Sequence, residues 1–237
     1  MIVGDIMKKF NEKNEFLFCM ILIVIYILVN SLCINLFGMT DYRTAIINIF
    51  LSIGISMFII YNNLSNYFGL SSFPSPKKYL YFIPLIMITS VNLWGGIYIG
   101  NSTSEIIFYI ISMIGVGFLE EIIFRGFLFR MMEKANVKSA IIVSAITFGV
   151  GHIINLLNGA ELIPPLIQVC YATSIGFLFV IKFYKSKSLI PCIITHCIVN
   201  SLSIFNIEST ISSYIAPIIL TIIPIIYTIY INKTVKE

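Results

Sequence analysis

Long apolar runs separated by short polar segments occupy most of the chain. A helix that crosses the hydrocarbon core of a bilayer, about 30 Å thick, needs roughly 20 apolar residues. Eight runs approach or exceed this length: 16–37, 45–60, 79–99, 106–131, 140–157, 162–183, 189–205 and 211–231. The pattern therefore predicts an all-α, polytopic membrane protein with about eight transmembrane helices.

Composition supports this prediction and excludes a soluble or disordered chain. The 237 residues are 58% hydrophobic and 11% charged, whereas a soluble domain is about 45–50% apolar and about 25% charged. We expect residues 1–237 to form a single integral-membrane domain. The polar segment 61–78, rich in Asn, Ser and Pro, cannot continue a helix. It predicts a division between a peripheral N-terminal helix pair at 16–70 and a six-helix part at 79–231.

The basic residues predict the orientation, because loops rich in lysine and arginine stay in the cytoplasm during insertion. With eight spans and a cytoplasmic N-terminus, all 15 basic residues lie near cytoplasmic ends except Arg43 and Arg125. Both chain termini are then cytoplasmic. The formal charge of +4 follows from this orientation, so we expect the lipid bilayer as a partner and no nucleic acid.

Polar side chains inside the apolar runs point to a functional site. At 1.5 Å per helical residue, Glu120, His152 and Asn200 each lie about 20 Å from the nearest cytoplasmic lysine on their own helix. His196 lies one helical turn before Asn200, on the same face. An ionisable side chain at mid-bilayer costs about 2.5–3.5 kcal/mol. We therefore expect these side chains, from three helices, to face one another.

Helical spacing separates the two adjacent glutamates. Glu121 and Arg125 stand at i and i+4, so they can form an ion pair along one helix face. Glu120 points about 100° away, toward a different neighbour. Gly149 and Gly151, just before His152, would let another helix approach closely.

These residue types fit hydrolysis by an activated water molecule. A carboxylate beside an imidazole can take a proton from water, and a second imidazole with an amide can stabilise an oxyanion. The set contains a base and donors but no convincing nucleophilic residue, which favours water attack on a peptide bond. A zinc ion held by Glu120, His152 and His196 is an alternative use of the same atoms, although the H-E-x-x-H pattern is absent.

Two other classes of protein use similar residues. A non-catalytic binding or immunity protein could keep the same fold without hydrolysis. A transporter or proton relay also places carboxylates and histidines at the bilayer midplane. Transporters commonly contain internal repeats, and none is visible in this chain.

Three motifs in order resemble those of a known family. They are E-E-x-x-x-R at Glu120, Glu121 and Arg125, F-x-x-x-H at Phe148 and His152, and H-x-x-x-N at His196 and Asn200. In this the chain resembles the CPBP family, the CAAX proteases and bacteriocin-processing proteins, also called Abi. The family is related to the Ras-converting CAAX prenyl endopeptidase. The resemblance covers about residues 106–205.

The resemblance implies an intramembrane endopeptidase with an eight-helix core. It implies that Glu120 and His152 activate water and that His196 and Asn200 stabilise the oxyanion, with Glu121, Arg125 and Phe148 in support. It also implies a peptide or membrane-protein substrate. The sequence itself has bacterial character, so we expect the protein in a bacterial plasma membrane. Family members are often labelled metalloproteases, and bacterial relatives are associated with bacteriocin immunity and peptide maturation.

Overall fold

The computed structural model describes residues 14–71, 73–74 and 83–235, and these form helices and no strand. The elements are α2 (Glu15–Phe37), α3 (Tyr42–Tyr61), α4 (Ile83–Ser90), η2 (Val91–Leu93), α5 (Thr103–Glu121), η3 (Ile122–Phe129), α6 (Arg130–Glu133), α7 (Val137–Gly151), η4 (His152–Leu156), α8 (Ile163–Ser186), α9 (Ile190–Leu202), η5 (Ser203–Phe205), η6 (Ile211–Ile215) and α10 (Ala216–Thr234). The protein is an all-α, multi-pass membrane protein.

Six helices of the described chain are long and apolar enough to cross a membrane. They match six of the predicted runs to within a few residues at each end. The run 189–205 appears as a shorter apolar helix over 190–205. The run 79–99 was predicted too long, because its described part is helical only over 83–93. The helical conformation ends at Leu93, and Gly96, with φ +120°, does not allow it to resume. Residues 79–82 lie outside the described residues.

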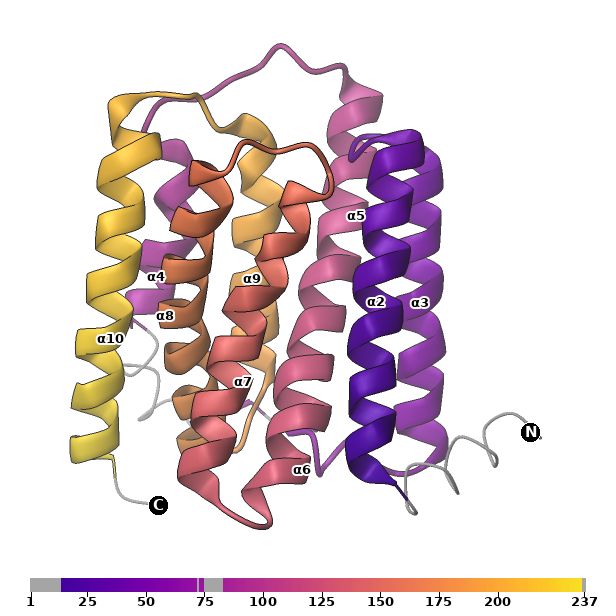
Figure 1. The fold of residues 1–237 in the computed structure, drawn as a ribbon, viewed down its shortest axis with the longest axis vertical. Coiled ribbons are helices and arrows are strands. Elements are labelled where there is room, and N and C mark those ends of the chain that lie inside the picture. Colours follow the sequence, from indigo (N-terminus) through magenta and orange to yellow (C-terminus); the bar gives the residue numbers. More distant parts are fainter. Residues whose placement is uncertain (1–13, 72, 75–82, 236–237) are drawn as a thin grey trace.

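The helices stand side by side with their axes roughly parallel (Figure 1). Helix α5 packs between α3 and α9, and α8 packs between α7 and α10. Helix α2 lies at the edge of the bundle beside α3 and contacts η3 and η4. This arrangement brings α2, the α5–η3 junction, η4 and α9 around one region at mid-height.

Capping hydrogen bonds fix the residues at which helices α5 and α7 begin. Ser102 and Glu105 form a reciprocal capping box at the start of α5, and the Asn136 side chain caps α7. The Lys134 ammonium donates to Glu15 at 2.6 and 2.8 Å, which ties the start of α2 to the end of α6. This hydrogen bond raises the pKa of Lys134.

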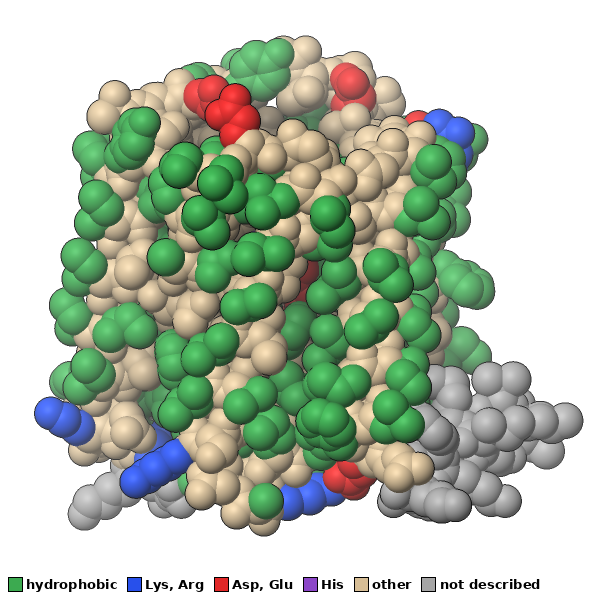
Figure 2. Space-filling view, in the orientation of Figure 1, with side chains coloured by type: hydrophobic (Ala, Val, Ile, Leu, Met, Phe, Trp, Pro, Cys, Tyr) green, Lys and Arg blue, Asp and Glu red, His purple; other side chains and the backbone are tan. Residues whose placement is uncertain are grey.

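Charged side chains gather at the two ends of the bundle, and the flank between them is apolar (Figure 2). Most blue side chains lie at the lower end of the view, where α2 begins and α10 ends (Figures 1 and 2). Bulky hydrophobic side chains such as Leu28, Phe50 and Ile226 are more than half exposed on the flank. A bilayer is the environment in which such a surface is stable.

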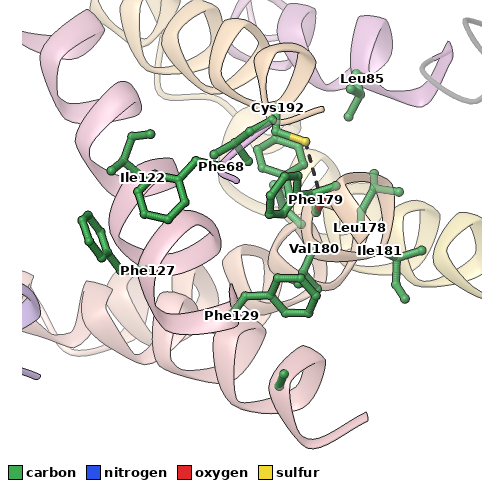
Figure 3. Close-up of a cluster of buried hydrophobic side chains, with 14 of the residues drawn as sticks. Phe68, Leu85, Ile122, Phe127, Phe129, Leu178, Phe179, Val180, Ile181 and Cys192 are labelled. Carbon is green, nitrogen blue, oxygen red and sulfur yellow. Dashed lines mark hydrogen bonds between the residues drawn. The ribbon is translucent and has the colours of Figure 1, made fainter. Parts of the chain in front are cut away.

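The core lies between η3, α8, α9 and α4 (Figure 3). Phe127 and Phe129 of η3 belong to the same buried cluster as Phe179 of α8. The Cys192 thiol donates to the Phe179 carbonyl at 3.6 Å. These contacts hold α9, which supplies His196, against α8.

Candidate active site

A buried ion pair stands where α5 passes into η3. Arg125 Nη1 donates to Glu121 Oε1 at 3.0 Å, and both side chains are fully buried. The predicted i, i+4 pair is therefore confirmed. The guanidinium carbon lies 4.1 Å from the Phe148 ring centre, so a cation–π contact adds to the pair.

The local helix geometry at this pair is unusual. Residues 122–129 form a π-helix, whose wider turn often marks functional positions. Arg125 lies inside it, while Glu120 and Glu121 are the last two residues of α5. The π-helix therefore begins directly after the two glutamates.

His196 of α9 lies between the two glutamates. Its Nδ1 is 2.9 Å from Glu121 Oε1, and its Nε2 is 3.3 Å from Glu120 Oε2. The imidazole is 7% exposed. His196 therefore links the buried ion pair to Glu120.

Glu120 turns away from Arg125, as its helical position predicts. The Tyr26 hydroxyl of α2 donates to Glu120 Oε1 at 2.7 Å. Oxygen Oε2 is buried and lies 3.3 Å from His196 Nε2, but it accepts no well-aligned hydrogen bond from the described residues. Because buried acceptors in native proteins nearly always have a partner, a water molecule is expected at this oxygen.

Two cavities meet at His152. A cavity of 70 Å³ is lined by Glu120, Tyr26 and residues of η4. A second cavity of 170 Å³ is lined by His196, Asn200 and residues of α8 and η2. His152 and Phe148 line both.

Phe148 holds the two histidines in place. Its ring centre lies 5.5 Å from that of His152 and 5.6 Å from that of His196, edge to face in both pairs. The structure thus brings all seven sequence-predicted site residues together, around the two cavities and the ion pair beside them. Acidic colour is visible in the depth of a crevice near the middle of the face in Figure 2.

The distance to the neighbouring helices differs between Gly149 and Gly151, the two glycines before His152. A Cβ on Gly149 would lie 2.8 Å from the Thr173 backbone nitrogen of α8, whereas one on Gly151 would meet only side-chain atoms at 4.0 Å. The predicted close approach is therefore confirmed at Gly149 and wrong at Gly151. The helix α8 passes on the Gly149 side.

Several polar side chains of the site were not predicted from the sequence. Tyr26 and Asn30 of α2 line the first cavity. Gln168 lines the second and accepts a hydrogen bond from Asn155 at 2.9 Å. A signal was available, because Tyr26 and Asn30 are spaced i, i+4 and share one face of a helix whose other polar residues, Glu15, Ser31 and Asn35, lie toward its ends.

The donor set does not fit a zinc ion in this arrangement. No group of three or more His, Cys, Asp or Glu within the described residues could hold a metal. Both ring nitrogens of His196 already face carboxylate oxygens.

Comparison with known proteins agrees with the motifs. Residues 102–202 match the family described as type II CAAX prenyl endopeptidase Rce1-like. No curated protein and no solved structure matches the chain. The matched segment runs from the cap of α5 to the end of α9, and it contains all three motifs.

Proposed function

Because residues 102–202 match the family described as type II CAAX prenyl endopeptidase Rce1-like, we propose that the protein is an intramembrane endopeptidase. It hydrolyses a peptide bond of a membrane-associated peptide or protein. The observation that carries this proposal is Glu120 Oε2, a buried carboxylate oxygen without a hydrogen-bond partner in the described residues. Glu120 shares a cavity with His152.

In the proposed reaction, a water molecule lies between Glu120 and His152. Glu120 accepts a proton from this water as the water oxygen attacks the peptide carbonyl carbon. A tetrahedral intermediate forms, and the carbonyl oxygen becomes an oxyanion. The proton then passes to the leaving amine as the C–N bond breaks, which completes hydrolysis.

His196 and Asn200 stabilise the oxyanion in this mechanism. Both line the 170 Å³ cavity on the other side of His152. Donors aimed at a developing negative charge lower the barrier. His196 Nε2 lies 3.3 Å from Glu120 Oε2 in this structure, so in this mechanism it turns to the oxyanion as Glu120 takes up the proton and loses its charge. Glu121 holds the His196 ring through Nδ1, and Arg125 in turn holds Glu121.

The physiological setting that we propose is a bacterial plasma membrane. The peptide substrate is a leader or signal to be matured, or a bacteriocin against which the cell is protected. A non-catalytic immunity protein of the same fold is the competing function. The variant Glu120→Gln separates the protease from the non-catalytic immunity protein.

Glu120→Gln keeps the shape of the side chain and removes the base. We expect cleavage to fall by about 10²- to 10⁴-fold, the usual contribution of a positioned general base. Secreted and membrane peptides from cells with native protein or Glu120→Gln are compared by mass spectrometry. A mature terminus that disappears with Glu120→Gln identifies the substrate.

The matched control is Glu161→Gln, the same change at an exposed loop position. It should leave the peptide profile unchanged. Native cleavage by Glu120→Gln would exclude Glu120 from the mechanism. Full protection from a bacteriocin by Glu120→Gln cells would favour the non-catalytic immunity protein.

A further inference from the structure

We propose that Tyr26 of α2 is a positioning residue of the reaction. Its hydroxyl holds one carboxylate oxygen of Glu120 so that the other oxygen faces the attacking water. This inference rests on the proposed function. It also extends the site to a helix that lies outside the family-matched residues 102–202.

The contact between the two side chains is short and partly buried. Tyr26 Oη donates to Glu120 Oε1 at 2.7 Å across 94 residues of chain. Tyr26 is 5% exposed, whereas its neighbours Ile25 and Leu28 on the same helix are 50% and 58% exposed. The tyrosine therefore lies on the one face of α2 that turns inward.

Packing fixes the direction of the Tyr26 ring. Tyr26 belongs to a buried cluster with Leu119, Phe124 and Phe148, which surround the Glu120 level of the bundle. A ring held in this way can offer its hydroxyl in one direction only. The hydroxyl is therefore preorganised toward the carboxylate.

Helix α2 is also held at both of its ends, so that Tyr26 keeps its height relative to Glu120. The Lys134–Glu15 ion pair, at 2.6 Å, fixes the start of the helix. Near its end, Ser31 Oγ and Asn35 Nδ2 donate to Asn158 Oδ1 at 2.5 and 2.8 Å. Asn158 follows η4, the element that begins with His152.

The two oxygens of Glu120 then differ in surroundings. Oε1 accepts from Tyr26, and Oε2 lies 3.3 Å from His196 Nε2 and lacks a hydrogen-bond partner in the described part of the chain. A hydrogen bond to an ionised acceptor is among the stronger ones in proteins. Loss of the Tyr26–Glu120 hydrogen bond would let the carboxylate rotate, and Oε2 would no longer be held toward the water.

Tyr26→Phe removes the hydroxyl and keeps the ring. We expect kcat to fall about tenfold, the effect of one hydrogen bond to a charged group, while KM stays within about twofold because α2 keeps its packing. The probe is a synthetic peptide that spans the cleavage site found with Glu120→Gln. Tyr67→Phe, which loses a hydroxyl bonded to the Arg130 carbonyl at 3.0 Å, is the matched control and should retain native kcat.

A double-mutant cycle separates positioning from general destabilisation. If Tyr26 acts through Glu120, then Tyr26→Phe should lower the residual activity of Glu120→Gln by less than about twofold. A full tenfold loss in the Glu120→Gln background, or an unchanged kcat in Tyr26→Phe alone, would overturn the inference. Normal cleavage by Glu120→Gln would instead contradict the proposed function, an outcome distinct from failure of the Tyr26 inference.

Thermal melting in detergent gives a readout that needs no substrate. The decrease in Tm of the double variant should be smaller than the sum of the decreases for Tyr26→Phe and Glu120→Gln. Both changes act on the same contact, since Tyr26→Phe removes the donor and Glu120→Gln replaces the charged acceptor by a neutral one. Additive decreases would show that the two side chains do not interact, and the inference would be wrong even where Glu120 is required for cleavage.

Discussion

Glu121 is the residue on which the buried charges of the site depend. Its Oε1 accepts from Arg125 and lies 2.9 Å from His196 Nδ1. Neither Glu121 nor Arg125 is exposed to solvent. Removal of one partner from a buried ion pair is costly, because the other charge remains without compensation.

Arg125→Met should therefore destabilise the protein by about 3–5 kcal/mol. The measurement is equilibrium unfolding in mixed micelles. Glu121→Gln combined with Arg125→Met should recover part of the loss, because no isolated charge remains. The control is Arg43→Met, which breaks the exposed Asp41–Arg43 pair and should change stability little. Equal losses of stability in Arg125→Met and Arg43→Met would contradict the buried-pair explanation.

At the scale of elements, close helix contacts determine how His152 meets the other helices. Helix α7 passes α8 at Gly149, three residues before His152. Helix α5 passes α9 in the same way, since a Cβ on Gly117 would lie 2.9 Å from the Cys197 backbone nitrogen. Small residues at such crossings allow two helices to approach closely within a membrane.

Gly149→Ala should lower Tm and activity together, because the added methyl group collides with α8 and shifts His152. Gly54→Ala is the matched control: it lies within α3 and its Cβ would meet no atom within 4 Å. In the control we expect an unchanged or slightly higher Tm, since Ala favours a helix over Gly by about 1 kcal/mol. A native Tm for Gly149→Ala would show that the crossing tolerates a side chain.

At the scale of the whole molecule, the two charged ends predict how the protein lies in the membrane. Helix α2 begins and α10 ends at the end of the bundle that carries most lysines and arginines (Figures 1 and 2). The turn that contains Gly159 joins η4 to α8 at the opposite end (Figure 1). The positive-inside rule assigns the lysine-rich end to the cytoplasm.

Single cysteines at positions 159 and 233, in a cysteine-free background, test this orientation. A membrane-impermeant thiol reagent added to intact cells should label Gly159→Cys and not Lys233→Cys, because only the turn at 159 faces outward. Permeabilised cells provide the control, in which both positions should react. Labelling of position 233 alone in intact cells would reverse the orientation.

The sequence by itself determined the features that depend on composition and short spacings. Apolar length predicted the bounds of most helices, and the i, i+4 spacing predicted the Glu121–Arg125 pair. The same reasoning failed at 94–99, where hydrophobic residues lie on both sides of two glycines but the helix ends at Leu93 and Gly96 adopts a φ of +120°. Hydropathy records what a side chain prefers to contact and not which φ the backbone adopts.

Only the tertiary structure decided which polar groups meet across the bundle. The Tyr26 contact with Glu120 joins residues 94 apart, and the His196 contact with Glu121 joins residues 75 apart. Helical periodicity gives the face and height of a residue on its own helix, but it gives neither the neighbouring helix nor its rotation. Those depend on how side chains such as Phe148 and small residues such as Gly149 pack, which is a property of the whole assembled bundle.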